Sequence, residues 1–219
     1  MNRTERRRVV ATPAERRAAE GRKRAILIAA VAVPALLIII AIVLFNNRAV
    51  QSASVAPVLS TVKVGQPAPT FAVSTTSGLF DLAKATDKPT LLEVFATWCS
   101  HCQRMTETLD KLHAKYGSRI NLIAVAGDPN NMDHTAPESQ ADVVAFATKF
   151  KVTYPIAFDP NLDVAHKYLQ GGYPTLVLIG KDGAVRGIRD GEVPQADLVA
   201  ALDLSLAGKK PDAKLGQKG

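Results

Sequence analysis

The stretch LLEVFATWCSHCQRM, Leu91–Met105, decides the fold and holds both cysteines of the 219-residue chain. The run Thr90–Ala96 is mostly apolar, which is typical of a strand buried on both faces of a sheet. A helix is expected to begin near Cys99 and to end at about Tyr116. The two cysteines are three residues apart, so Cys102 falls within the first turn of that helix.

A cysteine pair at the start of a helix suits thiol-disulfide exchange, in which a thiolate is the nucleophile. Unpaired backbone N–H groups and the helix dipole favour the thiolate of Cys99. Two intervening residues bring Cys102 within disulfide reach of Cys99. We therefore expect Cys99 to be the exposed attacking sulfur and Cys102 to be the more buried resolving sulfur.

Two structural explanations for the cysteines are weaker. A disulfide across so small a loop constrains the unfolded chain very little. A zinc site needs four ligands, and the sequence has no second cysteine pair, while His113, His134 and His166 show no ligand spacing. Accordingly, no metal site and no cofactor are predicted.

The first 45 residues predict a membrane anchor. Residues 1–24 carry nine Lys or Arg against three acids and are interpreted as a basic cytoplasmic tail. Residues 25–45 carry no charge and are long enough to cross a bilayer as a helix. A basic flank orients such a span with that flank in the cytoplasm, so the following domain would lie outside it. A cleaved signal peptide is the competing interpretation, although its apolar region is usually shorter.

The rest of the chain predicts one α/β domain. Residues 46–63 are interpreted as a linker, 64–207 as the folded domain and 208–219 as a loose polar tail. The part of the chain after residue 24 has a nearly balanced charge, with 18 basic and 17 acidic residues. This balance indicates no nucleic-acid partner. Alternation of strands and helices predicts a mixed central sheet flanked by helices. Strands are expected at Phe71–Val73, Leu79–Leu82, Thr90–Ala96, Ile120–Ala126, Pro155–Phe158, Thr175–Ile179 and Ala184–Arg189. Helices are expected at Cys99–Tyr116, Leu162–Tyr168 and Pro194–Leu206, with a further one that the capping box Thr135–Glu138 opens and that ends near Phe150.

Three motifs together resemble a known family. GQPAPTF, TLLEVFATWCSHC and GGYPTLVLIGKDGAV are similar in order and spacing to the TlpA/ResA-like branch of the thioredoxin-like superfamily. Members of that branch are membrane-anchored, extracytoplasmic thiol-disulfide oxidoreductases, and the resemblance covers residues 64–206. It implies a thioredoxin-like fold, protein thiol or disulfide substrates, and a membrane partner that donates or accepts electrons.

The resemblance also implies roles for residues around the cysteines. Glu93 is a carboxylate inside the apolar run LLEVF, where burial is costly. The resemblance places it as the buried acid beneath the disulfide, where a raised pKa would let it accept and return the proton of Cys102. A glutamate at the sheet edge that is turned to water is the competing explanation. Many ResA-like members instead carry an acid three residues after the second cysteine, where this chain has Met105. The bond between Tyr173 and Pro174 is expected to be cis, with the Tyr173 backbone pairing with a substrate strand.

Two further residues are candidates for the active face. Trp98 is expected to cover it, with plain packing as the competing explanation. His101 lies between the cysteines, where a positive or hydrogen-bonding group stabilises the thiolate and makes the couple more oxidising. An exposed histidine at the helix start with a small effect is the competing explanation.

The direction of exchange has two candidates. The resemblance favours a reductant of secreted or membrane proteins, for example in cytochrome c maturation or disulfide homeostasis, acting outside the cytoplasm of a bacterium. The Cys-x-His-Cys pattern instead favours a DsbA-like disulfide oxidase. A copper-binding thioredoxin-fold module and a peroxiredoxin are also considered. The peroxiredoxin hypothesis is weak because the proline that its Pro-x-x-x-Thr/Ser-x-x-Cys motif requires is missing.

Overall fold

The structure, a computed structural model, describes residues 62–215. The predicted basic tail, the predicted membrane span and all but the end of the predicted linker lie outside the described residues, as do residues 216–219. Within residues 62–215, no helix has the length and hydropathy that a bilayer crossing requires.

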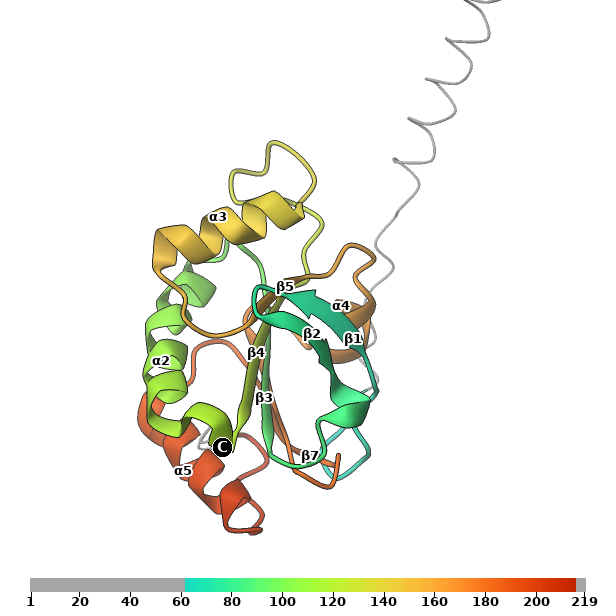
Figure 1. The fold of residues 1–219 in the computed structure, drawn as a ribbon, viewed down its shortest axis with the longest axis vertical. Coiled ribbons are helices and arrows are strands. Elements are labelled where there is room, and N and C mark those ends of the chain that lie inside the picture. Colours follow the sequence, from blue (N-terminus) through green and yellow to red (C-terminus); the bar gives the residue numbers. More distant parts are fainter. Residues whose placement is uncertain (1–61, 216–219) are drawn as a thin grey trace, which may run out of the picture. The chain divides into compact units, whose positions relative to one another are not determined.

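The described residues form a single seven-stranded mixed sheet with strand order β2-β1-β5-β4-β3-β6-β7 (Figure 1). The neighbours β5, β4 and β3 are parallel, whereas the other pairs are antiparallel. The strands are β1 (Ala72–Thr75), β2 (Gly78–Asp81), β3 (Thr90–Phe95), β4 (Asn121–Ala126), β5 (Ile156–Phe158), β6 (Thr175–Ile179) and β7 (Val185–Asp190). The predicted mixed sheet is therefore confirmed.

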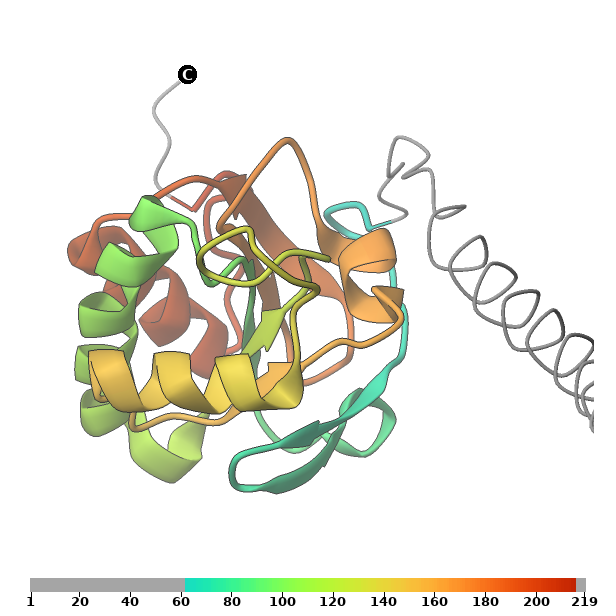
Figure 2. The ribbon, with the colours of Figure 1, turned by 90° about the horizontal axis from the view of Figure 1, so that it is seen from above.

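Helices cover both faces of the sheet, as Figures 1 and 2 show. They are α2 (Ser100–Tyr116), α3 (Gln140–Phe150), α4 (Asp163–Tyr168) and α5 (Gln195–Leu206), with short 3-10 turns at Leu82–Lys84 and Gly117–Arg119. One apolar cluster joins α2, α3 and α5 to one face of the sheet. A second joins α4 and the β1-β2 hairpin to the other face.

Strand β3 lies at the centre and divides its side chains between the two clusters. Leu91 and Phe95 belong to the cluster under α2, whereas Leu92 and Val94 belong to the opposite one. Because side chains alternate along a strand, Glu93 must share the face of Leu91 and Phe95. This alternation places an acid beneath α2.

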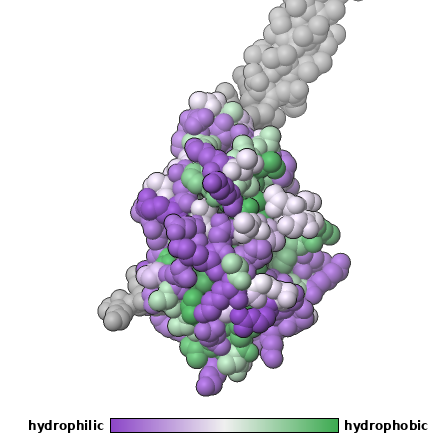
Figure 3. Space-filling view, turned by 60° about the vertical axis from the view of Figure 1, so that its left-hand side comes forward, coloured by the Kyte–Doolittle hydropathy of each residue, from purple (hydrophilic) through white to green (hydrophobic). Residues whose placement is uncertain are grey.

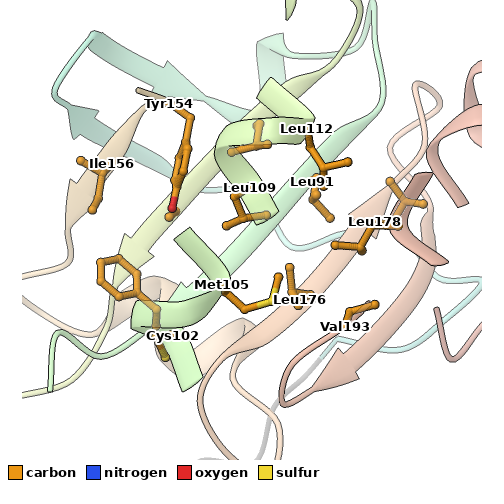
Figure 4. Packing of buried hydrophobic residues seen from close by; sticks show 14 of the residues in the cluster. Leu91, Cys102, Met105, Leu109, Leu112, Tyr154, Ile156, Leu176, Leu178 and Val193 are labelled. Atoms are coloured by element: carbon orange, nitrogen blue, oxygen red, sulfur yellow. The ribbon is translucent and has the colours of Figure 1, made fainter. Parts of the chain in front are cut away.

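Helix α2 is held on the sheet by an apolar stripe. Met105, Leu109 and Leu112 are 0–2% exposed and recur at the three-to-four-residue spacing of one helix face. Figure 4 shows them packed beside Leu91 of β3 and Leu176 of β6. The stripe fixes the first turn of α2, and with it the cysteines, relative to the sheet.

The helix predicted from the Thr135–Glu138 box begins later than expected. Its first residue is Gln140, and the side chain of Ser139 accepts the capping hydrogen bond from the Asp142 N–H at 3.3 Å. Glu138 is buried instead and takes no part in a capping box. The prediction of the box is therefore wrong, because a second cap residue follows one position after Glu138.

The predicted polar tail is also partly wrong. Leu215 is fully buried in the cluster under α5, and the Ile188 N–H of β7 donates to the Ala213 carbonyl at 3.0 Å. The folded unit therefore continues past the predicted boundary at residue 207 and covers the outer edge of β7.

The surface carries few large apolar side chains. The face in Figure 3 is mostly hydrophilic, with scattered apolar positions. Among the described residues, the exposed large apolar side chains are Val64, Leu79, Val144 and Leu204. They lie on four separate segments, which is ordinary for a folded domain.

Candidate active site

The turn between β3 and α2 places Cys99 at the N-terminus of the helix. Cys99 is the N-cap residue, and its Sγ accepts a hydrogen bond from the Cys102 N–H at 3.3 Å. The Cys99 N–H donates in turn to the carbonyl of Ala96 at 3.1 Å. The sulfur thus lies against the positive end of the helix.

Both cysteines are free thiols and both are buried. Cys102 is 1% exposed and Cys99 is 5% exposed. The expectation of an exposed Cys99 is therefore wrong for this reduced form, because its Sγ packs against the loop before β6 and donates to the carbonyl of Tyr173 at 3.6 Å.

The loop before β6 contains the predicted cis bond between Tyr173 and Pro174. Pro174 is buried, and Thr175 begins the strand. The Tyr173 hydroxyl donates to the carbonyl of Gly127 at 2.6 Å, which anchors its ring on the loop after β4. The backbone of Tyr173 is thereby fixed beside Cys99.

Glu93 lies 2% exposed on the face of β3 that α2 covers. Burial raises the pKa of its carboxyl from 4.5 to about 8. Its Oε1 atom is buried without a hydrogen-bond partner among the described residues. Burial, followed by the charge of Glu93, also raises the pKa of the Cys102 thiol far above its ordinary value. The negative charge of an ionised Glu93 therefore opposes ionisation of Cys102 inside the domain.

His101 lies at the surface, with a 60% exposed side chain. Its Nδ1 is 2.6 Å from Oε1 of Glu192, which precedes α5. Arg104 donates to the same oxygen from Nε at 3.0 Å, and this bond, followed by that from His101, lowers the pKa of Glu192. The ring makes no hydrogen bond to either sulfur in the described structure, so His101 belongs to a charged network at the rim of the site.

Trp98 lies half-buried beside the cysteines. Its ring meets that of Tyr173 edge-on, with centroids 6.0 Å apart, and packs on His134 with centroids 4.9 Å apart. Its Nε1 is buried without a partner among the described residues. Trp98 therefore links the cysteine turn to the loops after β4 and before β6.

Thr97 and Glu138 were not predicted as site residues. Thr97 is fully buried and Glu138 is 6% exposed, and Thr97 Oγ1 donates to Glu138 Oε2 at 2.6 Å. Burial raises the pKa of Glu138 to about 7. The sequence does not indicate this contact, because the spacing of Thr135 and Glu138 matches a capping box and so predicts a local role for Glu138.

No group of three or more His, Cys, Asp or Glu side chains within residues 62–215 is arranged to hold a metal ion. The chemistry that the described residues offer is that of two thiols and a buried acid. This arrangement is suited to disulfide exchange with a protein substrate.

A family model decides the relationship of this chain to known proteins. The model of the AhpC/TSA family matches residues 64–188, which is more than half of the sequence. The chain belongs to the AhpC/TSA family. This AhpC/TSA protein is 31% identical over 144 residues to thioredoxin-like protein YneN of Bacillus subtilis, a match that covers 65% of this chain and 81% of YneN. It is 30% identical over 145 residues to thiol-disulfide oxidoreductase ResA of Geobacillus thermodenitrificans, covering 65% and 78% of the two chains.

Solved structures have the same fold. A Chlorobium tepidum protein provisionally assigned as thiol:disulfide interchange protein DsbE is 25% identical, with a TM-score of 0.59, and the match covers 67% of this chain and 99% of that one. A thioredoxin family thiol:disulfide interchange protein from Chlorobium tepidum TLS is 27% identical, with a TM-score of 0.51, covering 64% and 96%. The predicted thioredoxin-like fold and ResA-like resemblance are confirmed.

Proposed function

We propose that this AhpC/TSA protein is a ResA-type thiol-disulfide oxidoreductase whose Cys99 and Cys102 exchange a disulfide with cysteines of protein substrates. The observation that carries the proposal is the position of Cys99 Sγ, which accepts from the Cys102 N–H at the start of α2. The same sulfur lies beside the Tyr173 carbonyl. The ResA relative supports it, being named a thiol-disulfide oxidoreductase.

In the reducing direction, the Cys99 thiolate attacks one sulfur of a substrate disulfide. The substrate bond breaks, a mixed disulfide forms, and the first substrate sulfur leaves as a thiolate that takes up a proton. Cys102 then loses its proton and attacks Cys99 Sγ, which releases the second substrate sulfur. The substrate gains two electrons, and the Cys99–Cys102 pair becomes a disulfide.

Glu93 is the proposed acceptor for the proton of Cys102. The Cys102 thiol has a strongly raised pKa, so it needs a base inside the domain. A carboxyl that ionises near pH 8 is a far better base near neutrality than one with an ordinary pKa. In the oxidising direction, Glu93 returns this proton as Cys102 leaves the disulfide.

We further propose that the domain acts outside the cytoplasm, tethered by residues 25–45, and that a membrane partner supplies its electrons. The support is the charge and hydropathy pattern of the first 45 residues together with the ResA relatives. The proposed direction is reduction, with secreted or membrane proteins, including apocytochrome c, as substrates.

The full-length chain in detergent tests the chemistry. Cys102→Ser should accumulate a mixed disulfide with insulin that a thiol reductant releases, whereas Cys99→Ser should form none. A trap by Cys99→Ser alone would reverse the assigned roles. Absence of insulin reduction by the wild-type protein would contradict the activity.

The reduction potential of the Cys99–Cys102 couple tests the direction. A value near that of thioredoxin, about −270 mV, supports a reductant, while one near that of DsbA, about −120 mV, supports an oxidase. A reporter fused after Gly219 tests the location, since activity of a cytoplasm-only reporter would contradict an extracytoplasmic domain. Anaerobic copper(I) titration checks for a copper-binding module, and peroxide turnover checks for a peroxiredoxin.

A further inference from the structure

Figure 1 shows the loop that connects β4 to α3, residues 127–139. Three side-chain contacts join this loop to the two segments that lie around Cys99. Its first residue, Gly127, accepts from the Tyr173 hydroxyl. His134 packs on the ring of Trp98, and Glu138 accepts from Thr97. The loop is therefore joined to the cysteine turn at two points and to the cis-proline loop at a third.

The contact between Glu138 and Thr97 buries a carboxyl group. Its Oε2 accepts from Thr97 Oγ1 at 2.6 Å, but its Oε1 is buried without a partner among the described residues. Burial of a polar atom without a hydrogen bond is unfavourable. An apolar pair of similar shape at positions 97 and 138 would avoid this cost, so packing alone does not explain the carboxyl.

The partner of Glu138, Thr97, leads into the active site. Thr97 is fully buried and is fixed from two sides, because its carbonyl also accepts from Gln103 Nε2 of α2 at 2.9 Å. The next residues along the chain are Trp98 and Cys99. Thr97 is thus a held position two residues before the attacking sulfur.

We propose that Glu138 is a positioning residue for disulfide exchange, holding Thr97 and thereby the Trp98–Cys99 turn in the conformation that presents Cys99 Sγ to an incoming disulfide. The inference rests on the proposed function of the cysteine pair. Glu138 acts through Thr97 and has no hydrogen bond to either sulfur. A displacement of the reacting atom of about 1 Å is enough to slow a reaction by up to about 100-fold.

Glu138 can accept the hydrogen bond from Thr97 whether its carboxyl is neutral or ionised. Burial, with Asp142 and Asp128 nearby, raises the pKa of its carboxyl, and the bond from Thr97 opposes this rise. Both the neutral and the ionised carboxyl can accept from Thr97. A glutamine at this position also offers an acceptor oxygen, whereas a leucine offers none.

The test compares conservative and disruptive variants of the full-length protein in detergent. Glu138→Gln and Thr97→Ser keep the acceptor and the donor, while Glu138→Leu and Thr97→Val remove them. Glu107→Leu is the matched control, since Glu107 is an exposed carboxylate on α2. For each variant, we would measure the rate of insulin reduction, the rate of reaction with the small disulfide 5,5′-dithiobis(2-nitrobenzoate), and the urea midpoint.

We expect Glu138→Leu and Thr97→Val to slow both reactions by about tenfold or more. This decrease lies within the roughly 100-fold loss of rate that misplacement of a reacting atom can cause. Glu138→Gln, Thr97→Ser and the control should stay near the wild-type rates. Wild-type rates in Glu138→Leu and Thr97→Val despite lower urea midpoints would overturn the proposal, as would a Glu138→Gln variant as slow as Glu138→Leu. If Glu138→Leu does not fold, the Thr97 pair decides. If the wild type does not reduce insulin, the proposed function fails, and the small-disulfide rates still decide the role of Glu138.

Discussion

Glu93→Gln should change how the stability of the domain depends on pH. The carboxyl of Glu93 is buried under α2, and burial raises its pKa from 4.5 to about 8. Between these values the folded protein keeps a proton that the unfolded chain has released. Stability therefore falls as pH rises across this interval. Glutamine has nearly the same shape and stays neutral, so the variant should lack this component.

The size of the effect follows from the two pKa values. One pKa unit corresponds to about 1.4 kcal/mol, so the difference between 4.5 and about 8 amounts to about 5 kcal/mol. The contribution is fully present below pH 4.5 and is lost by the time the pH exceeds 8. A loss of this size is comparable to the whole stability of many domains, which is about 5–15 kcal/mol.

The assay is urea unfolding of the reduced full-length protein at several pH values between 4.5 and 8, followed by the fluorescence of Trp98, the single tryptophan. The difference in unfolding free energy, wild type minus Glu93→Gln, should become more negative by about 4 kcal/mol over this range, because the carboxyl is already half ionised at each of its two pKa values. Glu107→Gln, at an exposed carboxylate, should run parallel to the wild type. Parallel curves for wild type and Glu93→Gln would refute the reasoning, because they would show that Glu93 ionises alike in the folded and unfolded states.

Three further variants test particular contacts. Leu215→Ala should lower the unfolding free energy by about 3 kcal/mol, whereas Leu204→Ala, at an exposed leucine, should have little effect; equal effects would contradict the packing of the C-terminal segment. Asp159→Ala should lower the free energy of unfolding, measured with urea, by about 3 kcal/mol. The Asp159 carboxylate accepts hydrogen bonds from three backbone N–H groups at the start of α4, and each of these donors would lose its partner. An unchanged urea midpoint would show that water takes the place of the carboxylate. His101→Ala should shift the reduction potential of the Cys99–Cys102 couple by less than about 30 mV, which corresponds to a tenfold change in equilibrium constant. The reason is that the His101 ring contacts Glu192 and neither cysteine. A larger shift would show that the ring acts on a cysteine sulfur.

Much of the fold could be predicted because the central strand and helix are each marked by their own pattern of apolar residues. The apolar run of β3 is buried throughout, and the apolar spacing of α2, with Gly117 as its C-cap, bounds that helix independently. The cysteine turn lies between them, so its position follows from two elements that were each well marked. Glu93 stood out for the same reason, as a charge within a buried strand.

The misses arose where one local pattern fits two structures. Thr135–Glu138 matches a capping box, yet Ser139 caps α3 and releases Glu138 for a contact with Thr97, which lies 41 residues away in the sequence. Leu215 is a single apolar residue in a polar stretch, so no periodicity revealed that it packs against Gly187 of β7. The burial of Cys99 likewise depends on Tyr173, which lies 74 residues away in the sequence. In each case the deciding partner is distant in the sequence.

The energetic cost of Glu93 and its proposed catalytic use have one physical origin. An acid with an ordinary pKa would be ionised at neutral pH. Its carboxylate would, however, be too weak a base to take a proton from Cys102, because the pKa of that thiol is strongly raised. Moving the acid into the interior raises its pKa to about 8, which strengthens the conjugate base by the same free energy that destabilises the ionised domain. Glu93→Gln should therefore stabilise the protein at pH 8 while slowing the step in which Cys102 resolves the mixed disulfide. A variant that gained stability without losing that step would separate the two effects and show that another group accepts the proton.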